Sequence, residues 1–219
     1  MWGGGGAFVL SLAACTYVFA VAWEAPPADG GGWRALAIDA GLFGVFALHH
    51  SVFARESVKG WISRIVPAHL LRSCYVWTAS ALLVAVLALW QPIAGDLYHV
   101  AGPASLANAG VQLFGIWLIA GSVARISALE LAGIEPAAGD ALQIGGPYRW
   151  VRHPLYLGWL LVVFGAAHMT ANRLAFASTS AAYLLLAIPW EERSLLRAFG
   201  EPYARYQRAV RWRVLPYVY

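Results

Sequence analysis

GGGAFVLSLAACTYVFAVAW, residues 4–23, is a run of 20 residues without a charge. About 20 predominantly apolar residues in a helix cross the hydrocarbon core of a bilayer. Three further runs, at 35–53, 74–90 and 105–124, have a comparable length and apolar character. The stretch therefore predicts a membrane-spanning helix and indicates a fold built from several of them.

Composition supports lipid as the solvent of this chain. Hydrophobic residues make up 60% of the sequence and charged residues 12%, whereas a soluble domain has about 25% charged residues. A soluble protein of 219 residues could not bury that much apolar surface. The net charge of +4 therefore indicates membrane orientation and contact with membrane lipids, and not binding to nucleic acid.

The later apolar runs are shorter and lie close together. Residues 155–167 and 174–190 are separated by only a few residues, which predicts a tight helical hairpin. Residues 56–71 carry a basic face and predict an interfacial helix. We expect an all-α polytopic membrane bundle of about six transmembrane helices. The whole chain, 1–219, is expected to form a single membrane domain. Its C-terminal part, after Trp190, is expected to be an amphipathic cytoplasmic segment.

The basic residues favour one orientation. If both termini are cytoplasmic, only Arg34 and Arg173 fall on the far side, as the positive-inside rule requires. The abundance of Ala, Gly and Arg, with Lys59 as the sole lysine, is typical of a GC-rich bacterial genome. These patterns predict the bacterial inner (plasma) membrane, with the cytoplasmic loops and tail carrying Arg55, Lys59, Arg64, Arg72, Arg125, Arg149, Arg152, Arg193, Arg197, Arg205, Arg208, Arg211 and Arg213.

A first polar motif is GPYRWVRHPLYLG, residues 146–158. Pro154 opens an apolar helix, a position at which proline is favoured. Arg152 and His153 then lie at a helix N-terminus, where free N–H groups and the helix dipole favour an anion. This arrangement predicts a carboxylate or phosphate site. The alternative is that Arg152 reaches lipid headgroups while His153 caps the helix.

A second motif is EERSLLRAFGEPYARY, residues 191–206. Two adjacent carboxylates, Glu191 and Glu192, at the end of a membrane helix indicate a functional role. The alternative is a helix cap in which Glu192 pairs with Arg193 or Arg197. Gly200 is expected to end this helix and Pro202 to begin another. The final helix should place Tyr203, Tyr206 and Val210 on one face and Arg205, Arg208 and Arg211 on another.

Three further polar residues lie at the end of the second apolar run or just after it. His49 and His50 are adjacent, so they point to different helix faces and are unsuited to bind one metal ion. A contact to a neighbouring helix or to a substrate is expected, and Arg55 follows closely. Cys15 and Cys74 provide no zinc-ligand spacing and no disulfide framework, so no metal site is predicted.

The ordered set of these motifs resembles the isoprenylcysteine carboxyl methyltransferase superfamily. The resemblance rests on residues 146–158, on Glu191-Glu192 and on FGEPYARY at 199–206. The segments 50–55, 72–76 and 165–183 resemble a bacterial subgroup that includes methanethiol S-methyltransferases. That subgroup usually carries an Asp-Leu-Phe-Gly-Leu-Arg-like stretch where this chain reads LELAGIE at 129–135.

The resemblance implies an enzyme that uses S-adenosylmethionine as methyl donor and releases S-adenosylhomocysteine. It implies an N-terminal four-helix part, 1–132, and a C-terminal cofactor-binding part, 133–219. The implied catalytic residues are Glu191, Glu192 and Arg193, and His49, His50 and Arg55 are candidate substrate residues. The implied cofactor-binding residues are Tyr148, Arg152, His153, Pro154, Tyr156, Gly158, Glu192, Tyr203 and Tyr206.

The implied roles within this set follow the chemistry of the donor. Arg152 and His153 would hold the carboxylate, the tyrosines would surround the adenosine and the sulfonium, and Gly158 would allow close approach to the backbone. Glu192 would bind amino or ribose groups. Glu191, with Arg193 or Arg197, would shape the acceptor end.

The acceptor is expected to be small or lipid-soluble, with a thiol first. An isoprenylcysteine carboxylate and a phospholipid amine are the alternatives within the superfamily. A non-catalytic membrane subunit is the alternative from another class of protein. A transporter is the least favoured, because Asp39 alone does not form an intramembrane proton relay.

Overall fold

The structure, a computed structural model, describes residues 2–53, 56–126 and 142–219. These residues form two compact units. The first consists of the described residues of Met1–Leu97 and Met169–Thr179, and the second of those of Tyr98–Ala128, Ala138–His168 and Ser180–Tyr219.

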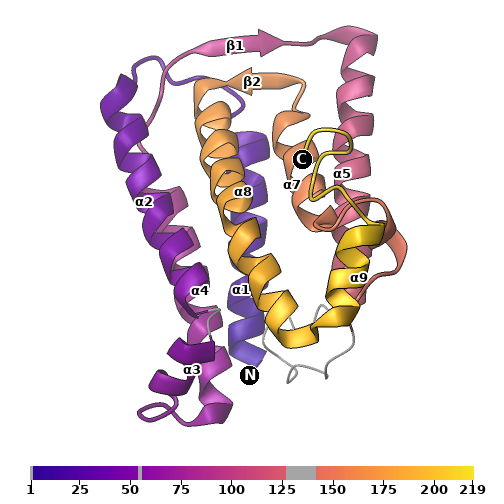
Figure 1. The fold of residues 1–219 in the computed structure, drawn as a ribbon. Helices are drawn as coiled ribbons and strands as arrows, with labels where there is room; N and C mark the ends of the chain where they lie inside the picture. Colours follow the sequence, from indigo (N-terminus) through magenta and orange to yellow (C-terminus); the bar gives the residue numbers. More distant parts are fainter. Residues whose placement is uncertain (1, 54–55, 127–141) are drawn as a thin grey trace. The chain divides into compact units, whose positions relative to one another are not determined.

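The first unit is a group of helices in which α4 packs against both α1 and α2 (Figure 1). Its aromatic core joins Trp23 to Trp90 at 5.0 Å between ring centroids and Phe176 to Trp23 at 5.5 Å. Its elements are α1 (Trp2–Tyr17), the π-helix η1 (Val18–Ala22), α2 (Gly32–Phe53), α3 (Glu56–Ile62), α4 (Ala68–Leu89) and the start of α8 (Ala171–Phe199).

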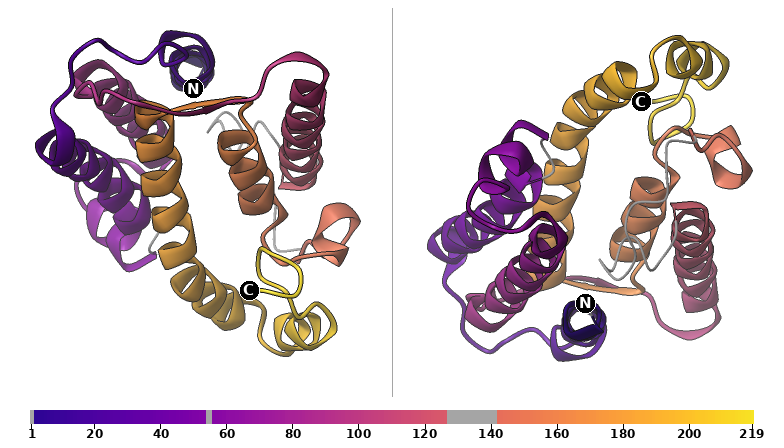
Figure 2. Two further views of the ribbon diagram at one scale, coloured as in Figure 1. Left: turned by 90° about the horizontal axis from the view of Figure 1, so that it is seen from above. Right: turned by 90° about the horizontal axis from the view of Figure 1, so that it is seen from below.

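The second unit is centred on α5 and α7, which lie side by side (Figure 2). Leu118 of α5 and Leu157 of α7 share a buried core with Val151, Ile188 and Val214. Its elements are η2 (Gly102–Ala104), α5 (Ser105–Ile126), η3 (Gly146–Arg149), α7 (Pro154–Phe164), the remainder of α8 and α9 (Glu201–Ala209).

Among the described residues, four helices are long and apolar enough to cross a membrane, and two shorter apolar helices, Ser73–Leu89 and Pro154–Phe164, accompany them. Leu10, Leu48 and Leu106 on the long helices remain 71%, 65% and 71% exposed, as side chains that face lipid do. The predicted helical membrane class is confirmed, whereas the count of about six spans stays a prediction. The four long helices are Gly4–Ala22, Gly32–Phe53, Gly102–Arg125 and Ala171–Phe199.

Two details of the prediction are wrong. Residues 56–71 do not form one interfacial helix, because α3 ends at Ile62 and α4 begins only after Pro67, at Ala68. The fold also contains a small two-stranded sheet of β1 (Asp96–His99) and β2 (His168–Thr170). Strand β2 lies in the short link between α7 and α8, which correspond to the two apolar runs that were expected to form a tight helical hairpin.

Helix α8 passes the end of the apolar run and stops where the sequence predicted, before Gly200. The helix continues beyond Trp190 to Phe199, so Glu191 and Glu192 lie within it. Gly200 then has a φ of 58° and Pro202 opens α9. Glycine reaches positive φ without steric cost, so the predicted break between these two helices is confirmed.

Helices α5 and α7 approach each other at a pair of glycines. A Cβ atom added to Gly158 would lie 2.6 Å from the carbonyl oxygen of Gly115 and 2.9 Å from Ile119. The side chain of Gln112 bridges the same two helices, since its Nε2 donates to the carbonyl of Val162 at 2.9 Å. The missing side chain at Gly158 is therefore required for helix packing, and its predicted role toward a cofactor stays a prediction.

We expect Gly158→Ala to destabilise the protein. The added methyl group must push α5 and α7 apart, and overpacking of this kind costs about 1–3 kcal/mol of unfolding free energy. Gly110→Ala on α5 is the control, because a Cβ atom there meets nothing within 4 Å. Thermal unfolding in detergent should show a lower Tm for Gly158→Ala alone. An equal Tm for the two variants would contradict the packing role.

Candidate functional site

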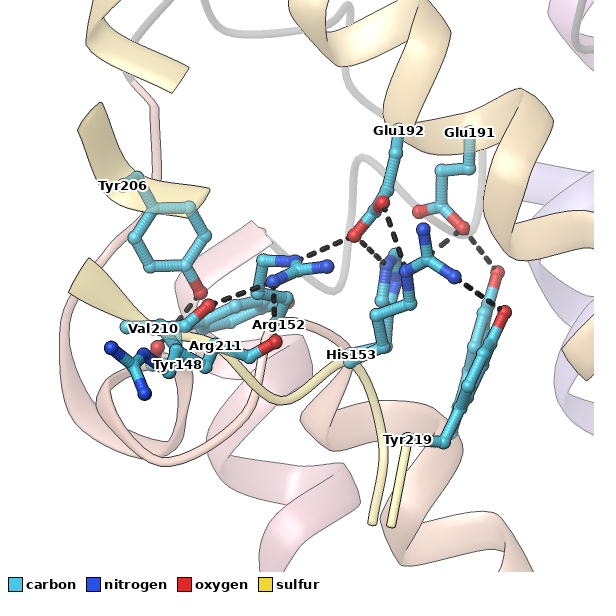
Figure 3. A network of polar contacts seen from close by, with 11 residues as sticks. Tyr148, Arg152, His153, Glu191, Glu192, Tyr206, Val210, Arg211 and Tyr219 are labelled. Atoms are coloured by element: carbon cyan, nitrogen blue, oxygen red, sulfur yellow. Dashed lines mark hydrogen bonds and ion pairs between the residues drawn. The ribbon is translucent and has the colours of Figure 1, made fainter. Parts of the chain in front are cut away.

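The polar residues of the second unit converge on the start of α7 and the end of α8 (Figure 3). Adjacent residues of a helix are separated by about 100° around its axis. Glu191 and Glu192 therefore point to different partners, and their two carboxylates have different surroundings (Figure 3).

Arg152 and Glu192 form a buried ion pair. Arg152 Nε donates to Glu192 Oε1 at 2.6 Å, and both side chains are 7% exposed. Arg152 Nη1 also donates to the carbonyls of Val210 and Arg211, each at 2.8 Å. Buried charges persist when they are paired and hydrogen-bonded, and this pair meets both conditions. The alternative in which Glu192 pairs with Arg193 or Arg197 is therefore wrong, and Arg152 is buried and does not extend to headgroups.

The N-terminus of α7 is closed by the backbone of another segment. The N–H of Arg152 donates to the carbonyl of Trp212 at 2.9 Å, and the N–H of His153 donates to that of Arg213 at 2.8 Å. These two N–H groups are therefore not free to bind an anion, and the predicted anion site at this helix N-terminus stays a prediction. Pro154 begins the helix as predicted, whereas the His153 side chain makes no capping bond within the described residues.

A second arginine, Arg213, contacts the same carboxylate. Its Nε lies 3.2 Å from Glu192 Oε2, and His153 Nε2 lies 3.4 Å from Glu192 Oε1. Arg193, expected in this role, is exposed and pairs with no described residue, while Arg197 donates to Ser194 Oγ at 3.1 Å. The sequence interpretation missed Arg213, because no motif distinguished it from the other arginines of the tail.

Glu191 has a more open environment. The Tyr156 hydroxyl donates to Glu191 Oε2 at 2.6 Å, and His153 Nδ1 lies 3.7 Å from the same oxygen. The His153 ring stacks on Tyr156, with 5.3 Å between centroids and 12° between planes. Because the Glu191 side chain is 42% exposed, it can exchange protons with water more readily than Glu192.

Tyrosines line the same region. Tyr206 donates from its hydroxyl to the carbonyl of Tyr148 at 2.7 Å, and the rings of Tyr203 and Tyr206 are 5.9 Å apart. Both are buried while Arg205 and Arg208 are exposed, which confirms the two predicted faces of α9; Val210 and Arg211 follow the end of that helix.

The tyrosine hydroxyls keep their protons at neutral pH. Burial and the nearby Glu191 carboxylate raise the pKa of Tyr148 to about 12. Burial, with the charge of Glu192, also raises the pKa of Tyr203 above its ordinary value. Both hydroxyls therefore remain hydrogen-bond donors at neutral pH.

One buried polar atom of this group, Tyr203 Oη, has no hydrogen-bond partner among the described residues. Tyr203 is only 1% exposed. Buried polar groups in proteins are almost always hydrogen-bonded, and an exception requires an explanation such as a ligand. The position of the Tyr203 hydroxyl near the Arg152–Glu192 pair indicates a binding site for a molecule with polar groups.

Comparison with known proteins identifies the family. Residues 105–202 match the phospholipid methyltransferase family. Methanethiol S-methyltransferase of Pseudomonas deceptionensis is 38% identical, over 83% of this chain and 73% of the relative. The enzyme of the same name from Mycobacterium tuberculosis is 34% identical, over 81% of this chain and 77% of the relative.

The chain belongs to the family of membrane methyltransferases that includes these methanethiol S-methyltransferases. Nurim of Danio rerio is also similar, with 30% identity over 76% of this chain and 67% of the relative. No solved structure gives a significant match. The family match includes Arg152, His153 and both carboxylates but ends before Tyr203, so the segment that closes the site lies beyond it.

The candidate substrate residues of the methyltransferase belong to the first unit. His50 Nδ1 and the Tyr75 hydroxyl form a hydrogen bond of 2.6 Å, which provides the predicted contact between neighbouring helices. His49 stacks on Tyr75 at 5.6 Å and 12°. Arg55 and the stretch 129–135 lie outside the described residues. The proposed roles of these residues toward a substrate stay predictions.

Proposed function

We propose that this methyltransferase uses S-adenosylmethionine to methylate a small thiol. The observation that supports it most directly is the buried Arg152–Glu192 pair, beside the Tyr203 hydroxyl, which has no partner among the described residues, in a chain similar to methanethiol S-methyltransferases over most of its length. We also propose a bacterial inner membrane location with both termini cytoplasmic, since this orientation leaves only two arginines on the far side.

The chemistry of the site suits the donor. S-adenosylmethionine presents a carboxylate, an ammonium group, ribose hydroxyls and an adenine. It supplies a methyl group that is bound to a positively charged sulfur. Arg152 would bind the carboxylate, Glu192 the ammonium or the hydroxyls, and the Tyr203 hydroxyl another polar group. The π faces of Tyr148, Tyr156 and Tyr206 would favour the positive sulfur.

The residues of the chain act mainly by positioning. Methyl transfer needs two reacting atoms in line and a site without competing water, so oriented binding provides much of the rate. A thiol acceptor reacts as its thiolate, which means that a base must take its proton. Glu191 is the carboxylate suited to this role, because it is partly exposed and is held by the Tyr156 hydroxyl.

Two other methyl acceptors, and one role without catalysis, are alternatives to methylation of a thiol. A phospholipid amine agrees with the description of the matched family, and an isoprenylcysteine carboxylate with the wider superfamily. A non-catalytic membrane subunit would have no need to retain a paired, buried Arg152 and Glu192. The thiol is favoured because the relatives that cover most of the chain are named for it.

Calorimetric titration of S-adenosylhomocysteine and S-adenosylmethionine into detergent-purified protein tests the donor site. We expect both to bind, and Arg152→Ala to remove binding, because the guanidinium that would hold the carboxylate is lost. Arg152→Lys, which keeps a charge but not the planar fork, should bind at least tenfold more weakly than wild type. Arg208→Ala is the matched control, since its 2.6 Å pair with Glu201 is exposed.

The same preparation tests the acceptor. It should form S-adenosylhomocysteine and dimethyl sulfide when methanethiol is added, and neither with phosphatidylethanolamine or a farnesylcysteine carboxylate. Methylation of the amine or the carboxylate alone would refute a thiol acceptor. Folded wild-type protein that binds neither S-adenosyl compound would favour the non-catalytic subunit.

A further inference from the structure

We propose that Arg213, held in place by Tyr219, is a positioning residue that fixes the Glu192 carboxylate for donor binding. This inference rests on the proposed function and extends it to a segment outside the family match, which ends at residue 202.

Arg213 contacts both Glu192 and Tyr219. Its Nε lies 3.2 Å from Glu192 Oε2, while its Nη1 donates to the Tyr219 hydroxyl at 2.9 Å. The guanidinium carbon also lies 5.0 Å from the centre of the Tyr219 ring, within the range of a cation–π contact. Two sides of the planar group are therefore fixed by one tyrosine, and the remaining edge faces the carboxylate.

The backbone around Arg213 is fixed as well. The carbonyl of Tyr219 accepts hydrogen bonds from the N–H groups of Arg213 at 2.9 Å and Val214 at 3.0 Å. The carbonyl of Arg213 in turn accepts from the N–H of His153 at 2.8 Å, and Val214 is completely buried in the core. This loop ties Tyr219 to the start of α7, so Arg213 has a defined position relative to Arg152 and His153.

The result is a carboxylate held by a different arginine at each oxygen. Arg152 binds Oε1 and Arg213 binds Oε2, so Glu192 cannot rotate without losing one of the two contacts. A carboxylate has about four acceptor positions, and the free positions are then presented in a fixed direction. Because Arg213 is 34% exposed and Arg152 only 7%, Arg213 should contribute orientation more than binding strength.

The test compares Arg213→Gln, Arg213→Lys and Tyr219→Phe in the full-length protein, by titration with S-adenosylhomocysteine and by steady-state kinetics. Arg213→Gln should weaken S-adenosylhomocysteine binding about tenfold and leave the KM of the acceptor unchanged. Arg213→Lys should recover part of the loss. Tyr219→Phe should weaken binding about threefold in the wild-type background and not further in Arg213→Gln, because contacting residues couple.

Two controls and two contrary results make the outcome decisive. Tyr217→Phe lies in the same loop on an 86% exposed side chain, and Arg208→Gln removes an exposed arginine; both should bind like wild type. If wild type binds S-adenosylhomocysteine and the Arg213 and Tyr219 variants bind equally well with only a lower Tm, the positioning role is overturned. If wild type itself does not bind, the proposed function fails first.

Discussion

Glu192→Gln is expected to weaken S-adenosylhomocysteine binding by about thirtyfold or more, since truncating one partner of a buried charge pair costs about 2–5 kcal/mol. The Glu192 carboxylate is 7% exposed and lies within ion-pair distance of Arg152, Arg213 and His153. The neutral amide leaves the Arg152 guanidinium buried without a counter-charge. Removing one partner of such a pair also costs about 3–5 kcal/mol of folding stability.

Measuring binding and stability on the same samples separates these two effects. Isothermal titration gives the Kd for S-adenosylhomocysteine, and thermal unfolding in detergent gives the Tm. Glu201→Gln is the matched control, because Glu201 makes a 2.6 Å pair with Arg208 while 66% exposed, and exposed pairs contribute little. A folded Glu192→Gln protein with wild-type affinity would return this carboxylate to a purely structural role.

Much of the fold could be predicted because its signals are local. Long apolar runs without charges determine the helical membrane class. The spacing of three between Tyr203 and Tyr206 identified the buried face of α9. Gly200 and Pro202 marked the break before it, since glycine permits the positive φ at which a helix can end and proline fixes φ and lacks an N–H. The short strands β1 and β2, of four and three residues, carry no pattern long enough to detect.

The pairing within the site could not be predicted from neighbouring residues. Local spacing suggested that Glu192 would pair with an arginine on its own helix, whereas its partner Arg152 is 40 positions away. A buried carboxylate needs a buried cation, and tertiary packing decides which arginine is buried. Resemblance placed Arg152 and Glu192 in one site, but their direct contact is a result of the fold.

Arg213 shows why the tail was misjudged. Arg205, Arg208 and Arg211 recur every third residue, which suggested a helical basic face extending through the tail. Helix α9 ends at Ala209, and the following carbonyls bind Arg152 and the start of α7 instead. An extended segment that supplies backbone carbonyls has no side-chain signature, so its contribution to the site is visible only in three dimensions.

Glu191→Gln should affect turnover and leave donor binding intact. Loss of a general base lowers kcat by about 10²–10⁴-fold, and Glu191 has the features of one: its side chain is 42% exposed, and the Tyr156 hydroxyl donates to it at 2.6 Å. The Arg152–Glu192 pair is unchanged in this variant, so the Kd for S-adenosylhomocysteine should stay within about twofold of wild type.

Tyr156→Phe provides the graded comparison for this prediction. It removes the hydroxyl that holds Glu191 but keeps the ring that stacks on His153, so kcat should fall less than in Glu191→Gln. Raising the pH should recover part of the activity of Glu191→Gln, because the thiolate then forms without a base. A parallel loss of S-adenosylhomocysteine binding, or a loss of kcat that higher pH does not relieve, would assign Glu191 to donor binding alongside Glu192, and the proton of the thiol would need another acceptor.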